Sequence, residues 1–157
     1  MIKREPRHDG LRSRFLNKLA NEAEKRDVIC NNVTASWSIS KALYRLRNSK
    51  LKGINMAYVI SMDSARVEMW IYHGPEERQE DSAYEVYRYF KSRKKEIELE
   101  YGGPLNWNSN EGRKTGFSIQ QDYPDFRLSD VHKWNLWVEK MVTDMKILDD
   151  AFIPHYT

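Results

Sequence analysis

The hydrophobic positions near both ends of the chain recur at helical spacing. In the first of these segments the apolar residues are four apart, at Leu11, Phe15, Leu19 and Ala23. This spacing predicts an amphipathic helix over about residues 10–26, with Asp9 available as its N-cap. Near the other end, spacings of three, four and seven predict a last helix that begins after Ser129 or Asp130 and carries apolar residues as far as Phe152.

Three segments between these helices have the patterns of strands. Residues 33–40 alternate strictly between apolar and hydroxyl-bearing side chains, which predicts a strand with Trp37 on its buried face. Residues 54–62 are apolar at both alternating positions, as is typical of a central strand that is covered on both faces. A turn at Asp63 and a further alternation over residues 67–71 complete a predicted hairpin.

The middle of the chain has a second helical pattern, which short strand-like segments follow. An apolar stripe predicts one long helix over about residues 76–101, and Gly102 would end this helix. Short strands are predicted at residues 105–108 and at about residues 117–121. The resulting order is α-β-β-β-α-β-β-α. Three consecutive strands between helices favour an α+β fold, with a mainly antiparallel sheet covered by helices.

The length and composition are those of an ordinary globular protein. The 157 residues, 40% of them hydrophobic, suit a single domain over residues 1–157, in which we expect residues 1–9 to form a flexible arm. No apolar run reaches the roughly 18 residues of a membrane span, and no signal peptide is recognised, so we expect a cytoplasmic protein. The single cysteine, Cys30, excludes an internal disulfide framework and a zinc site built from several cysteines.

Positive charge is concentrated in the first third of the chain. Residues 1–52 contain 13 Lys+Arg and 5 Asp+Glu, although the net charge of the whole chain is only +3. Five of these cations fall within twelve residues that contain no acid: Lys41, Arg45, Arg47, Lys50 and Lys52. We predict that they form a connection between two strands and contact nucleic-acid phosphates. Two other interpretations stay open: a solvated connection without a ligand and, from the spacing of Leu43, Leu46 and Leu51, a short helix packed on the core.

A second group of charged residues lies on the predicted helix over residues 76–101. It contains Lys91, Lys94, Lys95, Glu96, Glu98 and Glu100. Lysines and acids about one turn apart pair on the surface of a helix. We therefore expect ion pairs along a solvated helix face here.

The order of helix, three strands, helix and strand also occurs in restriction-endonuclease-like nucleases. Their site holds a divalent metal between carboxylates and uses a lysine, two residues after a glutamate, to position or activate water. Here Asp63 precedes Glu68 by five residues, but Asp63 is expected in a turn and Trp70 stands where the lysine is needed. Exposure to solvent explains Glu68 as well as a site does. We therefore predict no catalytic residue, no metal and no cofactor.

Several short motifs resemble those of a known family. They are Lys95-Glu96-Ile97-Glu98, Tyr101-Gly102, Leu105-Asn106-Trp107 and Trp37-Ser38-Ile39-Ser40. Over roughly residues 12 to 152, the chain resembles the uncharacterised bacterial and archaeal family called domain of unknown function 4268. Members often follow a nuclease-like domain in proteins of restriction or genome-defence type, so the resemblance implies nucleic acid nearby and supplies no catalytic residues. Glu98 and Trp107 match the family pattern best, and we predict an indole-to-carboxylate hydrogen bond between them.

Three functions are compatible with this sequence. The first is a non-enzymatic binding module in nucleic-acid metabolism or host–virus defence, which would contact nucleic acid through its basic first third. The second is a small protein-binding regulator, such as a phage-encoded inhibitor of a defence complex, which would use the acidic helix over residues 76–100 or an aromatic surface. The third is a degenerate nuclease. No membrane partner is expected, and the sequence leaves the oligomeric state open.

Overall fold

A computed structural model describes residues 7–26, 28, 41–45, 54–72, 80–108 and 116–156 of the chain. Its elements are α1 (Arg7–Lys25), β1 (Lys41–Arg45), β2 (Ile54–Ile60), β3 (Ala65–Tyr72), α2 (Glu80–Lys91), α3 (Lys94–Tyr101), β4 (Asn106–Asn108), β5 (Gly116–Tyr123), the 3-10 helix η2 (Val131–Lys133) and α4 (Trp134–Tyr156). The described strands form one sheet in the order β1-β2-β3-β5-β4, and every neighbouring pair is antiparallel. This arrangement confirms the predicted α+β class.

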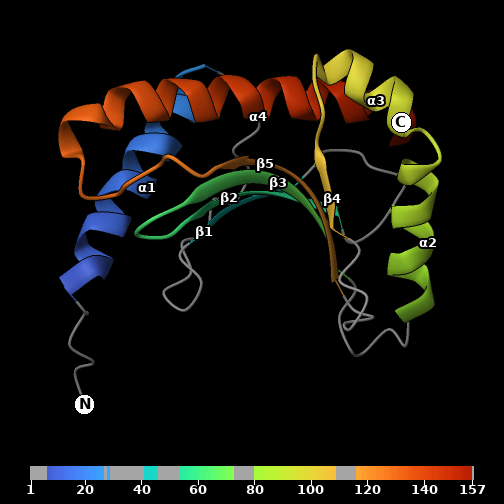
Figure 1. Ribbon diagram of the computed structural model, residues 1–157, viewed down its shortest axis with the longest axis horizontal. Helices are drawn as coiled ribbons and strands as arrows, with labels where there is room; N and C mark the ends of the chain where they lie inside the picture. Colours follow the sequence, from blue (N-terminus) through green and yellow to red (C-terminus); the bar gives the residue numbers. More distant parts are fainter. Residues whose placement is uncertain are drawn as a thin grey trace.

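The two faces of the sheet carry different side chains. One face is apolar, and its centre is formed by Met56, Met69 and Ile119, which the register aligns across β2, β3 and β5. These three residues are at most 2% exposed. Figure 1 shows an arched sheet, with α1, α3 and α4 on its convex side and α2 beside its descending end. Because side chains alternate along a strand, the residues between the apolar ones lie on the concave face.

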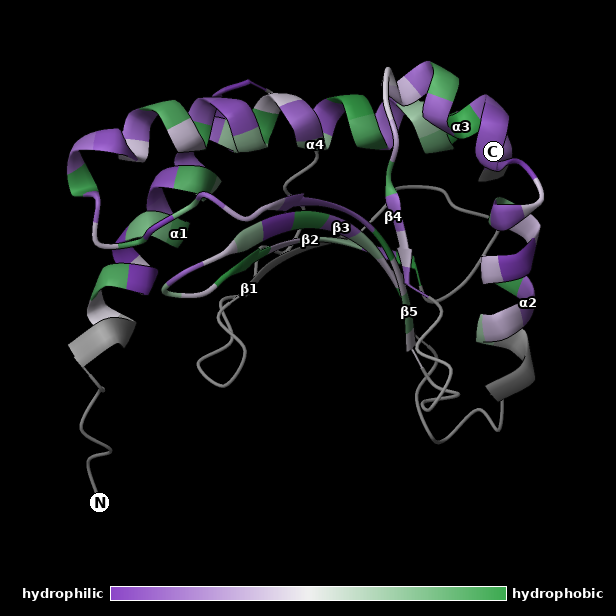
Figure 2. Cartoon of the chain, viewed as in Figure 1, coloured by the Kyte–Doolittle hydropathy of each residue, from purple (hydrophilic) through white to green (hydrophobic). Residues whose placement is uncertain are grey.

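The first and last helices bury their predicted apolar stripes. The buried hydrophobic residues of α4 are Trp134, Val138, Met141, Val142, Met145, Leu148, Ala151 and Phe152. In α1, Phe15 is fully buried, and its ring centroid lies 5.4 Å from that of Trp134. Figure 2 shows hydrophobic and hydrophilic residues alternating along α1 and α4. Each large apolar side chain buried in this way contributes about 1.5–3 kcal/mol to folding.

Two predicted turns are confirmed. The β2–β3 hairpin closes where the backbone N–H of Ser61 donates to the carbonyl of Ser64, at 2.9 Å, and Asp63 lies in the turn between them. Helix α3 ends at Gly102, which has φ 92 and donates its N–H to the carbonyl of Glu98. A left-handed residue at this position favours glycine because glycine has no Cβ to clash.

The single long helix expected over residues 76–101 is wrong, because the chain breaks between α2 and α3 at Ser92 and Arg93. In a continuous helix the carbonyl of Tyr89 would accept the backbone N–H of Arg93. Instead it accepts the hydroxyl of Ser92 at 2.7 Å and Nη1 of Arg93 at 3.0 Å. The N–H of Arg93 donates to the carbonyl of Phe90. Side-chain donors have replaced the helical bond, which ends α2 without a glycine or proline.

Three element boundaries differ from the expected ones. Residues 41–45, expected in a connection or a short helix, form the edge strand β1. All five pair antiparallel with residues 55–59 of β2. Helix α1 begins at Arg7, so Asp9 lies in its first turn rather than at its N-cap. The last helix is preceded by η2, whose N-cap Asp130 makes no side-chain capping bond. The strand expected over residues 33–40 lies outside the described residues.

Within the described part of the chain, none of the helices is long and apolar enough to cross a membrane.

Candidate functional site

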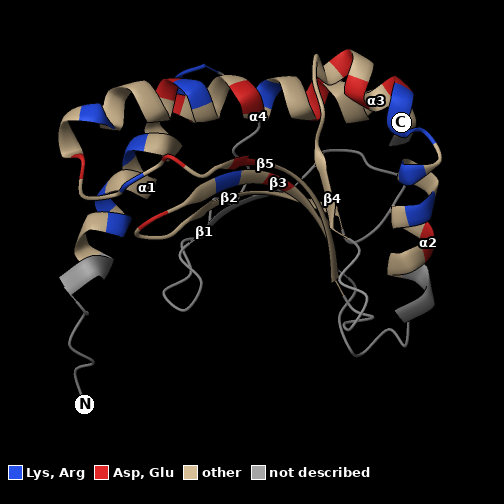
Figure 3. Ribbon diagram, in the orientation of Figure 1, with Lys and Arg blue, Asp and Glu red and all other residues tan. Residues whose placement is uncertain are grey.

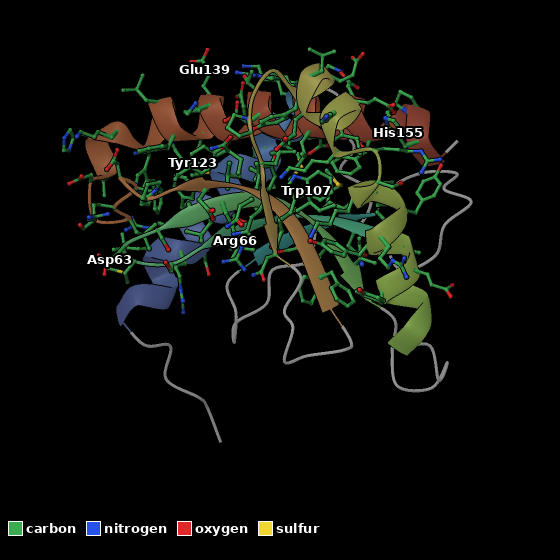
Figure 4. All side chains as sticks on the ribbon, turned by 45° about the vertical axis from the view of Figure 1, so that its right-hand side comes forward. Asp63, Arg66, Trp107, Tyr123, Glu139 and His155 are labelled. Carbon is green, nitrogen blue, oxygen red and sulfur yellow. The ribbon has the colours of Figure 1, made fainter. Side chains whose placement is uncertain are left out.

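The structure does not bring the nuclease-like residues together. Asp63 is exposed in the hairpin turn, whereas Glu68 lies three positions beyond the start of β3 and is 2% exposed. Three strand positions span about 10 Å, and Figure 4 shows Asp63 at the hairpin tip, apart from Arg66 on the sheet. Glu68 is therefore buried rather than solvated. Among the residues that the structure describes, no group of three or more His, Cys, Asp or Glu is arranged to hold a metal ion.

A polar network covers the concave face of β3, β5 and β4. Its members are Arg66, Glu68, Asn106, Ser118, Gln120 and Asp122. Nε of Arg66 donates to Oε2 of Glu68 at 3.0 Å. Ser118 donates to Gln120 at 2.6 Å, and Gln120 donates to one oxygen of Asp122 at 2.7 Å. These bonds run along β3 and along β5, and the bond that Nδ2 of Asn106 donates to Asp122 at 3.0 Å joins β4 to β5.

The predicted bond between Glu98 and Trp107 is present. Nε1 of Trp107 donates to Oε2 of Glu98 at 3.3 Å, and the same oxygen accepts the backbone N–H of Leu105 at 2.7 Å. The two side chains are half-buried. Their bond joins α3 to β4, so the best-matching positions of the family motif have a structural role.

The predicted nucleic-acid-binding residues lie only partly within the described chain. Lys41 and Arg45 are the first and last residues of β1, opposite Val59 and Asn55 of β2. The other residues of this set, and the predicted core residue of the preceding strand, lie outside the described residues: Arg47, Lys50, Lys52 and Trp37. Contacts of the basic segment with nucleic acid therefore stay a prediction.

Some of the cations in the basic first third are engaged within the molecule. Nζ of Lys18 donates to Oδ1 of Asn135 at 2.7 Å. Nη1 of Arg26 donates to Oγ1 of Thr143 at 2.7 Å, and Nη2 of Arg26 lies 3.9 Å from Glu139. Lys18 of α1 and Arg26, the residue after the end of α1, thus join this helix to α4, where Figure 4 shows Glu139.

A more accessible group of cations lies at the junction of α2 and α3. We call it the cationic surface, and it consists of Arg88, Lys91, Arg93, Lys94 and Lys95. All are exposed except Arg93, which is half-buried. Two exposed rings lie among them, since Tyr84 is 47% and Tyr89 37% exposed. Figure 3 shows Lys and Arg along α2 and its junction with α3, while Asp and Glu follow along α3.

The ion pairs expected for these lysines do not form. Within the described residues, none of the ion pairs involves Lys91, Lys94 or Lys95. Lysines that do pair with an acid one helical turn away are in α4, at Lys140–Asp144 and Lys146–Asp150. The acid one turn from Lys94 is Glu98, whose Oε2 bonds Leu105 and Trp107 instead.

The helix dipole does not explain Lys94 and Lys95 either. Lys94 and Lys95 are in the first turn of α3, where the positive end of the dipole disfavours cations. The N-cap residue of this helix, Arg93, makes no side-chain capping bond. The dipole therefore disfavours Lys94 and Lys95, whereas Arg88 and Lys91, in the last turn of α2, lie where it favours cations. Sequence reasoning noted Lys91, Lys94 and Lys95 but missed this surface, because the helix break and the engagement of Glu98 depend on contacts that spacing does not reveal.

The break also holds Arg93 in one place. The centre of its guanidinium lies 3.8 Å from the ring centroid of Tyr89, and its Nη1 donates to Tyr89 and Ser92. The hydroxyl of Tyr89 donates in turn to the carbonyl of His155 at 2.6 Å, at the end of α4 shown in Figure 4. Within the described residues, Nε and Nη2 of Arg93 have no acceptor. A guanidinium held in this way loses little rotamer freedom when it binds an anion.

These features define an α+β protein with a cationic and aromatic surface at the end of its sheet. Residues 11–156 match the family described as "Domain of unknown function (DUF4268)", and the chain belongs to this family. None of the curated proteins matches the chain.

Proposed function

We propose that this protein is a non-enzymatic module that binds nucleic acid through the cationic surface. The observation that supports it is the grouping of five cations, none with an ion pair in the described chain, around two exposed tyrosines. Phosphate groups are the natural partners of such a group, because lysine and arginine release condensed counterions when they neutralise a nucleic acid. We further propose, from the family resemblance, that the binding serves nucleic-acid metabolism or host–virus defence.

Arginine and tyrosine favour nucleic acid over a simple polyanion. Arg88 lies over Tyr84, with its guanidinium 5.7 Å from the ring centroid, and Arg93 lies over Tyr89. Arginine forks match phosphate geometry, while exposed aromatic rings offer stacking surfaces to bases. Lys41 and Arg45 of β1, with the rest of the basic segment, would be additional phosphate contacts. The protein-binding alternative is weaker, since Glu98 in the middle of the acidic helix is engaged with β4.

The proposal is tested by the salt dependence of binding. The double variant Lys94→Gln, Lys95→Gln removes two cations from the surface. A matched control, Lys133→Gln with Lys146→Gln, removes the same charge from exposed positions of η2 and α4. Binding of labelled DNA and RNA, single-stranded and duplex, is measured at several salt concentrations.

We expect the first double variant to bind more weakly and with a flatter slope of log affinity against log salt. Each lost phosphate contact lowers the slope by about 0.7 on single strands and about 0.9 on duplex DNA. The control should keep the wild-type slope. Absence of salt-dependent binding by the wild type, or equal slopes for the two double variants, would contradict the proposal.

A further inference from the structure

Tyr84 and Tyr89 are the two ends of a chain of aromatic rings that runs through the protein. The rings in contact, in order, are Tyr84, Phe117, Tyr87, Trp107, Phe152, Phe90 and Tyr89. Centroid separations along this chain range from 5.0 Å to 6.5 Å. The five inner rings belong to α2, α4, β4 and β5, so elements far apart in sequence support the two exposed ends.

Tyr84 is the more accessible of the two rings, because Arg88 lies 5.7 Å from its centroid, whereas Arg93 lies 3.8 Å from that of Tyr89. Its neighbour Phe117 lies at 5.7 Å and is inclined to it by 44°, and nearly half of the residue is exposed. Tyr89, by contrast, is covered by the guanidinium of Arg93 and tethered through its hydroxyl. An exposed ring whose position is fixed from below is suited to stacking, because little entropy is lost when a second ring covers it.

The cations follow Tyr84 along one side of α2. Arg88 is four residues and Lys91 seven residues after Tyr84, which places all three on the same face of the helix. Seven residues of helix span about 10 Å, so Arg88 and Lys91 lie at increasing distances from Tyr84 along this face. Beyond Lys91, the cationic surface continues through the junction into α3.

We infer that the ligand of the cationic surface is single-stranded nucleic acid, with one base stacked on Tyr84 and the following phosphates on Arg88, Lys91 and the junction. The inference rests on the proposed function and adds strandedness to it. In a duplex the faces of the bases are stacked on one another, so only an unpaired strand offers Tyr84 a base to stack on. A duplex would use the cations alone.

The test compares Tyr84→Leu, which removes the ring, with Tyr84→Phe, which keeps it. The ligands are oligodeoxythymidylate, oligouridylate, a duplex of equal length, an abasic strand with the same phosphates, and polyglutamate. Melting temperatures of both variants establish that they are folded, and Tyr84 is exposed enough for either residue to be accommodated. Binding of the abasic strand is measured with the wild-type protein, so this comparison does not depend on the folding of any variant.

We expect wild type and Tyr84→Phe to prefer the single strands with bases. Tyr84→Leu should weaken that binding by roughly 5- to 150-fold and leave duplex binding unchanged. Replacement of the bases by abasic sites should weaken binding to the wild type by a similar factor. Tighter binding of oligodeoxythymidylate than of oligouridylate would identify DNA as the better ligand, and the reverse order would identify RNA.

Equal binding of duplex, abasic and base-bearing strands, unaffected by Tyr84→Leu, would overturn this inference and leave the proposed function intact. Polyglutamate bound as tightly as the single strands would also overturn it, since an acidic peptide offers charge without bases. If none of the nucleic acids binds, the proposed function fails and the inference fails with it.

Discussion

Replacement of Glu98 by alanine should destabilise the protein by about 2–3 kcal/mol. Its Oε2 accepts the N–H of Leu105 at 2.7 Å and the indole N–H of Trp107 at 3.3 Å. Hydrogen bonds to a charged group contribute about 1.5–3 kcal/mol, and the longer of these two contributes less. Leu105 is only 9% exposed, so its N–H would lose its partner where little water can replace it.

Urea denaturation of three variants measures this contribution. Glu98→Gln keeps an acceptor oxygen but not the charge, so it should lose about half as much as Glu98→Ala. The control is Glu100→Ala, an exposed acid in the last turn of the same helix, where a negative charge contributes nothing favourable. For a chain of this size, 2–3 kcal/mol lowers the melting temperature by roughly 4–12 °C. Equal midpoints for Glu98→Ala and Glu100→Ala would refute the assignment of these bonds as the link between α3 and β4.

Three further predictions concern the sheet. A Cβ at Gly116 would overlap the ring of Trp70, so Gly116→Ala should lower the melting temperature, and an unchanged value would show that the indole lies elsewhere. Met69 is fully buried at the centre of the sheet, so Met69→Ala should cost about 2–5 kcal/mol in urea denaturation, and a loss below 1 kcal/mol would contradict its core position. Burial, followed by the hydrogen bond to Asp144 and its charge, raises the pKa of Tyr123 well above its usual value of 10.0. A raised pKa means that the stability from this group is complete below about pH 10 and falls as the pH rises further, so Tyr123→Phe should show a shallower alkaline decline. An identical loss of stability at alkaline pH in both proteins would show that ionisation of Tyr123 does not cause this loss.

The elements that could be predicted from the sequence are those with local signals. The apolar spacing of α1 and α4 and the stop at Gly102 depend only on residues within a few positions of one another. The hairpin around Asp63 is of the same kind. The strand β1 was not predicted, because residues 41–45 are recognisable as a strand mainly through pairing with β2, which comes later in the chain.

The break between α2 and α3 shows why helix boundaries without glycine or proline escape sequence reasoning. Ser92 and Arg93 are ordinary residues in a helix, and nothing in their spacing distinguishes them. They end the helix because both side chains donate to the same carbonyl, that of Tyr89. The stacking of Arg93 on Tyr89 holds one of those donors in place. Such a geometry is specified by three side chains together rather than by the propensity of any one.

The candidate site was harder to predict than the fold because net charge averages over charges that the fold separates. Residues 80–101 contain five cations and six acids, so this segment has almost no net charge in the sequence. Its cations nevertheless lie together ahead of Glu96, while Glu98, the acid one turn beyond Lys94, bonds β4 and the residue before it. Lys18 of α1 and Arg26, the residue after α1, are on the other hand engaged by Asn135, Thr143 and Glu139 of α4. An accessible positive surface therefore depends on which acids the tertiary contacts engage elsewhere. In this protein the bond that attaches α3 to β4 also engages the acid one turn beyond Lys94, so one contact supports both the fold and the proposed interface.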